Sequence, residues 1–120
     1  MKKVMVLALA LCCGLLADTR AQETKKDTPA ATRHFEVRML GGNSFDPPII
    51  EIKVGDTITW INDDENMFHT ATSKDGTTFD TNRVESLRHS KRIKTFPAAG
   101  TIEYRCTQHS SMTGKVVVGP

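Results

Sequence analysis

Cysteine is scarce in this 120-residue chain, and it is unevenly placed. Two of the three cysteines, Cys12 and Cys13, lie in the apolar opening segment, and the third is Cys106. A chain that loses the opening segment keeps one cysteine, which excludes an intramolecular disulfide. A lone thiol in an oxidising compartment is liable to oxidise unless it is buried or bound to another group. If the protein is exported, it must therefore protect Cys106.

The chain also lacks a strong excess of charge of either sign. It has 16 Lys and Arg against 14 Asp and Glu, a formal net charge of +2. The small excess comes from the opening segment, because without Lys2, Lys3, Asp18 and Arg20 the basic and acidic side chains are equal in number. A surface that binds nucleic acid needs clustered Lys and Arg in clear excess. The composition therefore predicts no nucleic-acid partner.

The opening residues have the layout of a secretory signal peptide. Two lysines precede an apolar run over residues 4–17, which is short for a membrane-spanning helix. Thr19 and Ala21 then provide small residues before a cleavage site at Gln22. We therefore expect a signal peptide over residues 1–21, export to the periplasm and no transmembrane segment in the mature form.

The opening segment has two alternative interpretations besides a cleaved signal peptide. A retained membrane anchor is less favoured because the apolar run is short. Lipidation at Cys12 or Cys13, as in bacterial lipoproteins, is less favoured again. The residues that precede these two cysteines, Leu11 and Cys12, are ones that such sites usually avoid.

A polar segment separates the opening residues from the rest of the chain. Residues 22–32, QETKKDTPAAT, lack large apolar side chains and contain Pro29. This composition is typical of a flexible linker. We therefore expect one folded domain over residues 33–120, a length that suits a single hydrophobic core.

From residue 33 onward, apolar residues recur at every second position. Such alternation predicts strands with one packed and one solvent-facing side. It occurs in the segments HFEVRML, IIEIKV, DTITWI, TIEYRC and GKVVV, which are separated by turns rich in Gly and Pro. No long amphipathic helix is indicated after residue 21, although residues 81–88 could form one or two helical turns. We predict an all-β fold, a two-sheet Greek-key β-sandwich of about seven to eight short strands.

The stretch YRCTQHSSMTGK contains three residues that bind soft metal ions. Cys106, His109 and Met112 follow one another at intervals of three. Cys106 shares the alternation of Ile102 and Tyr104, so its sulfur is expected to point inward at the end of a strand. His109 and Met112 then lie in the turn before the next strand. A strand end and a tight turn would thus hold the three donors close together.

Thiolate and imidazole together favour copper or zinc. Structural zinc sites use four Cys or His ligands, and a thioether is a poor zinc ligand. One thiolate, two imidazoles and a weak axial thioether are the ligand set of a blue-copper centre. This set needs a second histidine, and His69 is the best candidate because it lies in a loop just after a predicted strand. His34, at a strand start, and His89, in the run RHSKR, are expected to be surface histidines.

Two segments, WINDDENMFHT and GTIEYRCTQHSSMTGKVVV, together resemble the copper-binding signature of the cupredoxins, in the branch of plastocyanin, pseudoazurin and amicyanin. FDPPIIEIKVGDTITW is similar to the strand pair before the first histidine of that family. The resemblance covers residues 33–118, and its short loop resembles that of amicyanin most. It implies that His69 and His109 are imidazole ligands, Cys106 the thiolate and Met112 the axial thioether of one copper ion, cycling between Cu(I) and Cu(II).

Three residues near these ligands depart from the family pattern. Thr70 follows His69 where many relatives have an asparagine that bridges the two ligand loops. Phe68 and Gln108 stand where proline is frequent. A threonine hydroxyl can still donate and accept a hydrogen bond. The departures leave the ligand set complete but put the surroundings of the ligands, and so the reduction potential, in question.

Charged and apolar side chains flank the ligand segments. Asp63, Asp64 and Glu65 are expected to form a solvated turn, with a docking role as the alternative. The basic residues of the later run are expected to be the solvent-facing side of a strand, and they are Arg88, Lys91, Arg92 and Lys94. Met67 and Phe68 could form an apolar rim where a redox partner approaches.

The resemblance implies an exported, mononuclear blue-copper protein that shuttles single electrons between redox partners and is expected to be a monomer. The partners would be a cytochrome, a dehydrogenase or a reductase. The alternative function is a periplasmic copper carrier or chaperone, which usually has a methionine-rich, exchangeable site. Catalysis is not expected, because multicopper enzymes need further histidine clusters and this chain has four histidines.

Overall fold

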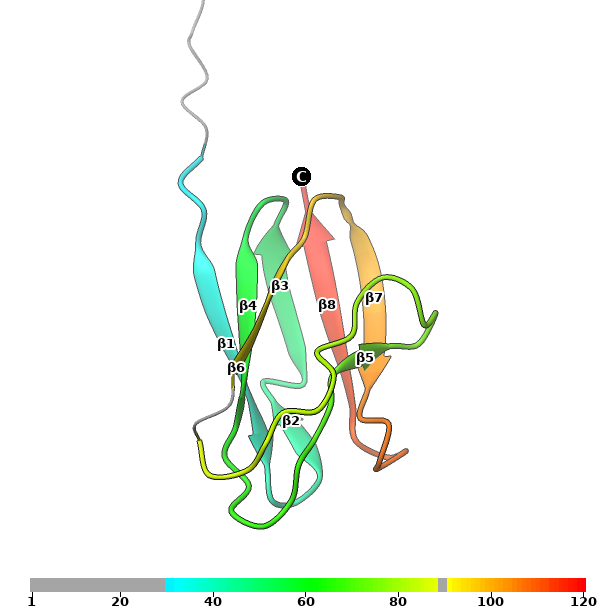
Figure 1. Cartoon of the computed structure of the whole chain (residues 1–120). Coiled ribbons are helices and arrows are strands. Elements are labelled where there is room, and N and C mark those ends of the chain that lie inside the picture. Colours follow the sequence, from blue (N-terminus) through cyan, green and yellow to red (C-terminus); the bar gives the residue numbers. More distant parts are fainter. Residues whose placement is uncertain (1–29, 89–90) are drawn as a thin grey trace, which may run out of the picture.

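The computed structural model describes residues 30–88 and 91–120, and the predicted signal peptide and most of the predicted linker lie outside these ranges. Within them the protein has eight strands and no helix, arranged as two packed sheets (Figure 1). The strands are β1 (His34–Leu40), β2 (Ser44–Asp46), β3 (Ile49–Lys53), β4 (Thr57–Asn62), β5 (Thr72–Ser73), β6 (Lys91–Thr95), β7 (Gly100–Arg105) and β8 (Thr113–Gly119). The predicted all-β sandwich is confirmed.

Each sheet has four strands and mixes parallel with antiparallel pairs. The first sheet has the order β2-β1-β4-β6, with β1 and β4 parallel. The second has the order β3-β8-β7-β5, with β3 and β8 parallel and β7 and β8 antiparallel. Figure 1 shows that β4 and β7 run towards the same end of the sandwich. The segments that follow these two strands therefore meet at one end of the molecule.

An aromatic cluster joins the two sheets in the core. Trp60 of β4 stacks on Phe79 with ring centroids 5.1 Å apart and meets Tyr104 of β7 edge-on at 5.8 Å. Tyr104 also contacts Phe45 of β2 at 4.7 Å. Burial raises the pKa of Tyr104 to about 12. Because aromatic pairs add stability beyond the area they bury, this cluster fixes how the sheets pack.

The turn between β3 and β4 shows how a short polar segment is held. Gly55 has a positive φ of 89°, a conformation in which glycine carries little steric cost. The Asp56 carboxylate accepts the backbone N–H groups of Lys53 and Arg33 and pairs with the Arg33 guanidinium at 2.7 Å. These bonds lower the pKa of Asp56 to about 2 from its ordinary 3.8, mainly through the side chain of Arg33.

The helical turns considered for residues 81–88 are absent. Val84 instead forms an isolated antiparallel bridge with His69. Leu87 and Arg88 have positive φ values of 70° and 60°, which a helix cannot contain. The segment is not helical, and residues 86–88 form a turn, because its backbone bonds with the loop after β4 rather than with itself.

Candidate metal centre

His69 lies in the loop after β4 and is fixed through its backbone. Its N–H donates to the Val84 carbonyl at 3.1 Å, and the Val84 N–H donates to the His69 carbonyl at 2.8 Å. Asn62, the last residue of β4, donates its side-chain amide to the carbonyls of Met67 and Val84. The loop therefore crosses the end of the sandwich in a defined path, and the His69 side chain is fully buried.

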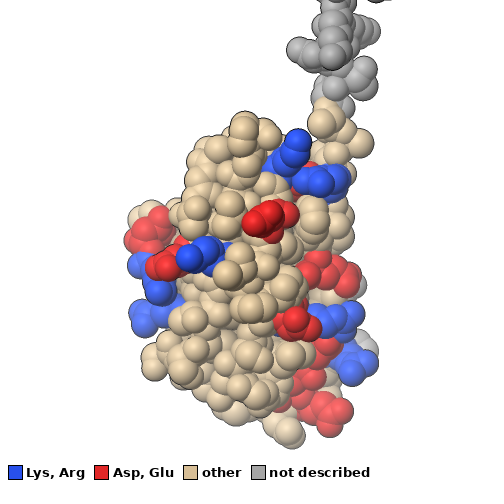
Figure 2. Space-filling model, turned by 180° about the vertical axis from the view of Figure 1, so that it is seen from behind, with Lys and Arg blue, Asp and Glu red and all other residues tan. Residues whose placement is uncertain are grey.

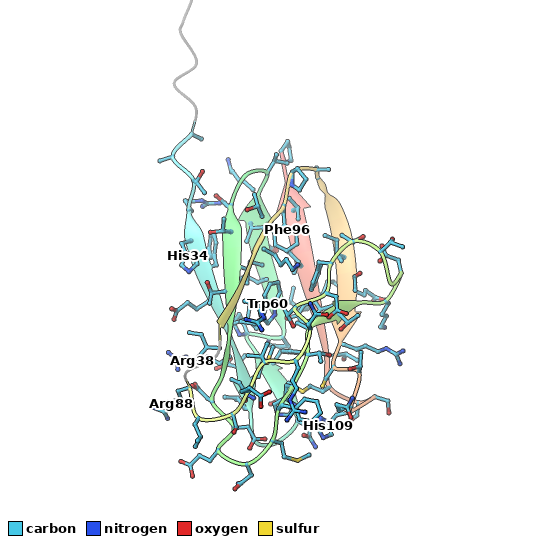
Figure 3. The ribbon with its side chains drawn as sticks, viewed as in Figure 1. His34, Arg38, Trp60, Arg88, Phe96 and His109 are labelled. Carbon is cyan, nitrogen blue, oxygen red and sulfur yellow. The ribbon has the colours of Figure 1, made fainter. Side chains whose placement is uncertain are left out.

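The other three predicted ligands lie between β7 and β8. Cys106 directly follows β7, and its side chain is fully buried, as the alternation predicts. The Cys106 N–H donates to the Met112 carbonyl, and the Met112 N–H donates to the His109 carbonyl, both at 2.9 Å. These bonds continue the antiparallel pairing of β7 with β8 into a tight turn. Figure 3 shows His109 at the end of the sandwich away from Phe96, with Trp60 between them.

Three of the predicted donor atoms converge on one point. The Cys106 Sγ is 3.8 Å from the His69 Nδ1 and 3.7 Å from the His109 Nδ1, and the three atoms lie within 4.8 Å of one another. His109 is half-buried, whereas Cys106 and His69 are fully buried. Among the described residues, His69, Cys106 and His109 form the one group of three or more His, Cys, Asp or Glu side chains that could hold a metal ion.

The spacing of these atoms fits a shared metal ion. Nitrogen and sulfur ligands about 2.0–2.3 Å from one ion, arranged in a trigonal plane, lie about 3.6–3.8 Å apart. Both measured distances to the Cys106 sulfur are close to this range. Met112 is fully buried and packs in the same core cluster as Cys106. The donor set therefore fits a site with a thiolate and two imidazoles, with a thioether in the same turn.

Asp64 is a buried side chain beside His69 that the sequence pattern missed. Its carboxylate is buried and lies 3.0 Å from the His69 Nε2, so the expectation of a solvated turn is wrong for this residue. Its pKa is lowered, first by the Asn66 backbone N–H, while burial opposes the shift. The Asn62 side chain accepts the Asp64 N–H, a local turn that Asn and Asp favour. In the sequence, the one sign of this turn was the placement of Asn62 two residues before Asp64.

The neighbours of Asp64 in the acidic run behave differently from it. Asp63 pairs with Arg38 at 2.6 Å and with Arg88 at 3.5 Å. Glu65 is exposed, as a solvated turn predicts. Figure 3 places Arg38 and Arg88 on the far side of this end of the sandwich from His109. The run therefore contains three carboxylates with three different environments.

Thr70 links the two ligand segments, although a different residue is frequent there. Its Oγ1 accepts the Thr107 N–H at 2.9 Å and lies 3.1 Å from the Thr107 Oγ1. Its backbone N–H donates to the Cys106 Sγ at 3.4 Å. This bond ties the His69 loop directly to the Cys106 sulfur. Threonine thus bridges the loops in this chain.

His34, the remaining histidine among the residues that the structure describes, does not join the cluster. His34 is exposed, and its ring nitrogens contact the hydroxyls of Thr57 at 2.8 Å and Thr59 at 3.0 Å. It is the surface histidine that the strand register predicts. His89 lies outside the described residues.

Comparison with known proteins identifies the type of centre. Residues 35–119 match the family model described as copper binding proteins, plastocyanin/azurin family. The chain belongs to this family. The predicted resemblance to cupredoxins is confirmed, and the metal of this plastocyanin/azurin-family protein is one copper ion, for which its cluster of two histidines and a cysteine is suited.

Two relatives of the chain are amicyanins. Amicyanin of Paracoccus denitrificans is 38% identical over 76 residues, which are 62% of this chain and 57% of that protein. Amicyanin-alpha of Methylorubrum extorquens is 31% identical over 100 residues, which are 82% of this chain and 81% of that protein. The chain thus spans somewhat more than half of the Paracoccus relative and most of the Methylorubrum one.

Solved structures of the family share the fold. The reduced Cu(I) form of an amicyanin variant at pH 4 matches with a TM-score of 0.64 and 32% identity, covering 72% of this chain and 82% of that one. A purple cupredoxin from Nitrosopumilus maritimus matches with a TM-score of 0.63 and 26% identity, covering 70% of this chain and 98% of that one. The family assignment therefore stands on sequence and on structure.

Proposed function

We propose that this protein is a blue-copper electron carrier whose copper is bound by His69, Cys106, His109 and Met112. The observation that carries the proposal is the convergence of two imidazole Nδ1 atoms on one buried cysteine sulfur. Bound copper supplies a one-electron Cu(II)/Cu(I) couple, so that a reduced partner gives up one electron and an oxidised partner takes it.

Burial and hydrogen bonds hold the proposed ligand side chains in nearly fixed positions. Cys106, His69 and Met112 are fully buried, so water has little access to the sulfur. The Thr70 N–H donates to that sulfur, and the Thr70 hydroxyl ties the His69 loop to the Cys106 turn. Fixed ligands suit a carrier because they need little rearrangement when the charge of the centre changes by one. The proposed role of Cys106 also explains how a lone thiol escapes oxidation after export.

His109 is the ligand through which electrons would enter and leave. It is half-buried, whereas the other three proposed ligands are fully buried. The turn around it, residues 106–114, has no charged side chain. Met67, 46% exposed, is the exposed apolar side chain of the neighbouring loop. A small, mostly uncharged contact of this kind suits a transient electron-transfer complex with a cytochrome, dehydrogenase or reductase.

The charge distribution on one face of the molecule does not favour a nucleic-acid partner. Figure 2 shows basic and acidic side chains interspersed on one face of the molecule, without a continuous basic area.

None of the described segments forms a helix that could span a bilayer. The signal-peptide pattern of residues 1–21 supports export to the periplasm, where the protein would act as a monomer.

A copper carrier is the weaker candidate because its site must exchange metal easily. Here two imidazoles and a thiolate converge, and only one methionine lies in the ligand turn. Catalysis is also the weaker candidate, because the described residues offer no second cluster of metal ligands. Electron transfer needs one copper ion with fixed ligands, and this arrangement provides them.

Reconstitution with Cu(II) tests the proposal. We expect an intense visible band from thiolate-to-copper charge transfer, one copper per chain, and fast reversible voltammetry. Copper should stay bound when a weak chelator is added. A colourless Cu(II) protein would refute the blue-copper site, and rapid loss of copper to the chelator would favour the carrier.

A further inference from the structure

The Asp64 carboxylate makes directed contacts with both of its oxygens. Oδ1 accepts the backbone N–H groups of Asn66 at 2.8 Å and Met67 at 3.2 Å. Oδ2 lies 3.0 Å from the His69 Nε2. Oδ1 is therefore committed to the loop backbone, which leaves Oδ2 in a fixed position to accept a hydrogen bond from the imidazole.

The backbone around Asp64 is itself held in place. The Leu87 N–H donates to the Asp64 carbonyl at 3.1 Å, and the Arg88 N–H donates to the Asn62 carbonyl at 2.8 Å. Leu87 and Arg88 have positive φ values, which cost energy for residues other than glycine. The fold maintains two such residues at the point where their backbone N–H groups hold the carboxylate segment in place.

The contact decides which nitrogen of His69 carries a proton. A buried carboxylate accepts a hydrogen bond and donates none, so the facing Nε2 must be protonated. In a neutral imidazole, Nδ1 then has a free lone pair, and Nδ1 is the atom that lies 3.8 Å from the Cys106 Sγ. The same residue also brings a negative charge within one imidazole ring of the proposed metal position.

We propose that Asp64 is a positioning residue of the copper centre: it holds His69 in the metal-binding tautomer, and its negative charge favours Cu(II) over Cu(I). This inference rests on the proposed ligand role of His69. A carboxylate that accepts the second N–H of a ligand histidine typically raises metal affinity, and its loss costs about 10- to 100-fold. The copper of this chain should therefore bind more tightly, and at a lower reduction potential, than it would without Asp64.

Glu65 provides a matched control. It carries the same charge one residue further along the chain but is exposed. Asp64→Asn and Glu65→Gln each remove one negative charge and change the side-chain volume little. A general effect of net charge would move the potential similarly in both variants, whereas a specific bond to His69 would move it in Asp64→Asn.

The experiment measures copper affinity and reduction potential of the copper-loaded wild type and both variants. For Asp64→Asn we expect Cu(II) binding to weaken by about 10- to 100-fold. We also expect the potential to rise, by about 59 mV for each tenfold loss of Cu(II) affinity relative to Cu(I). Glu65→Gln should stay close to wild type. Equal values for the two variants would overturn the proposal.

A second measurement keeps the proposal testable if Asp64→Asn does not fold. NMR of the metal-free wild type at about pH 8, where an imidazole is ordinarily neutral, should show the His69 ring protonated at Nε2 and bare at Nδ1. A proton on Nδ1 with a bare Nε2 would contradict the role of Asp64. Because this readout needs no copper, it can fail while the visible band is present, and it can succeed while the band is absent. The failure of this inference is thus distinct from the failure of the proposed function.

Discussion

The loop from Asn62 to Thr70 and the turn from Cys106 to Met112 bring the proposed ligands to the same point by different means. The first is stabilised by side chains: Asn62 and Asp64 bond to its backbone, and Asp64 contacts the His69 ring. The second has no charged residue and is closed by two backbone hydrogen bonds. The loop depends on buried polar partners, and the turn depends on its short length and on the strands that flank it.

This difference separates two properties of the centre. The polar loop holds one buried proposed ligand, His69, so substitutions in it should change copper affinity and potential. The turn supplies the sulfur and the half-buried His109, so substitutions of these residues should change colour, folding and access, whereas substitution of Met112 in the same turn should change the potential and keep the colour. The predictions that follow test this division, beginning with the atom that both segments contact.

Cys106→Ser should have the largest effect. The Cys106 Sγ contacts the His69 Nδ1, the His109 Nδ1 and the Thr70 N–H, so its loss removes the point where the segments meet. We expect the visible band to disappear completely while the sandwich still folds, because serine is only slightly smaller than cysteine and leaves the aromatic core untouched. Absorption after Cu(II) addition and circular dichroism provide the measurements. A blue colour in the Cys106→Ser variant would overturn the ligand assignment.

Gly114→Ala should destabilise the turn where it enters β8. A Cβ added at Gly114 would lie 2.3 Å from the Tyr104 Cζ and 2.5 Å from its hydroxyl oxygen. The Tyr104 ring is fully buried and cannot move away easily, so we expect a loss of about 3 kcal/mol in unfolding free energy. Denaturant unfolding of the metal-free protein measures it. Gly42→Ala, where an added Cβ meets nothing within 4 Å, is the control and should change stability little.

Thr70→Val should weaken the link between the two segments. The substitution removes the hydroxyl that accepts the Thr107 N–H at 2.9 Å and leaves that donor without its partner. We expect a loss of about 2 kcal/mol in unfolding free energy, together with a shifted reduction potential. Thr101→Val, on an exposed position of β7, is the matched control. If both variants unfold at the same denaturant concentration, Thr70 is not a bridge of energetic importance.

Met112→Leu should change the potential without removing the colour. Leucine is similar in volume and suits a fully buried position, but it donates no electron pair to the metal. We expect copper and the visible band to remain and the potential to rise, because the weak axial ligand of such sites tunes it. Voltammetry measures the change. An unaltered potential would remove Met112 from the ligand set.

Asp56→Asn should have the smallest effect on the centre, because Asp56 lies in the β3–β4 turn, away from both ligand segments. Its folded-state pKa of about 2 is below the ordinary 3.8, so its stabilising effect is complete above the ordinary pKa and is lost as the pH falls through about 2. The difference in denaturant midpoint between wild type and Asp56→Asn should therefore be present at neutral pH and shrink as the folded-state pKa is approached. Glu51→Gln, on an exposed strand position, is the control.

Much of the fold could be predicted because alternation marks strands that bury one side. The patterns of β1, β3, β4, β7 and β8 were clear in the sequence. The other three strands, β2, β5 and β6, could not be predicted from the sequence for physical reasons. β2 and β5 are only three and two residues long, and β6, KRIKT, has one apolar side chain, so its pairing with β4 decides its conformation.

The convergence of the proposed ligands could be predicted for a related reason. Cys106 follows an alternating strand, so its direction was fixed by the register, and Met112 is close enough in sequence to share its turn. The buried position of Asp64 was not predicted, because a carboxylate in a polar loop is usually solvated and the Asn62–Asp64 pair indicates only a local turn. Its burial depends on backbone N–H groups and an imidazole that only the folded loop assembles. Thr70 needed the structure as well, since its bridge crosses 37 residues.

The positions of the chain ends have a practical consequence. The described chain starts and Pro120 ends at the same extremity of the sandwich, and His109 lies at the other one (Figures 1 and 3). A surface anchor, an affinity tag or an electrode linker attached near residue 30 or at Pro120 would therefore leave the end of the sandwich around His109 facing outward.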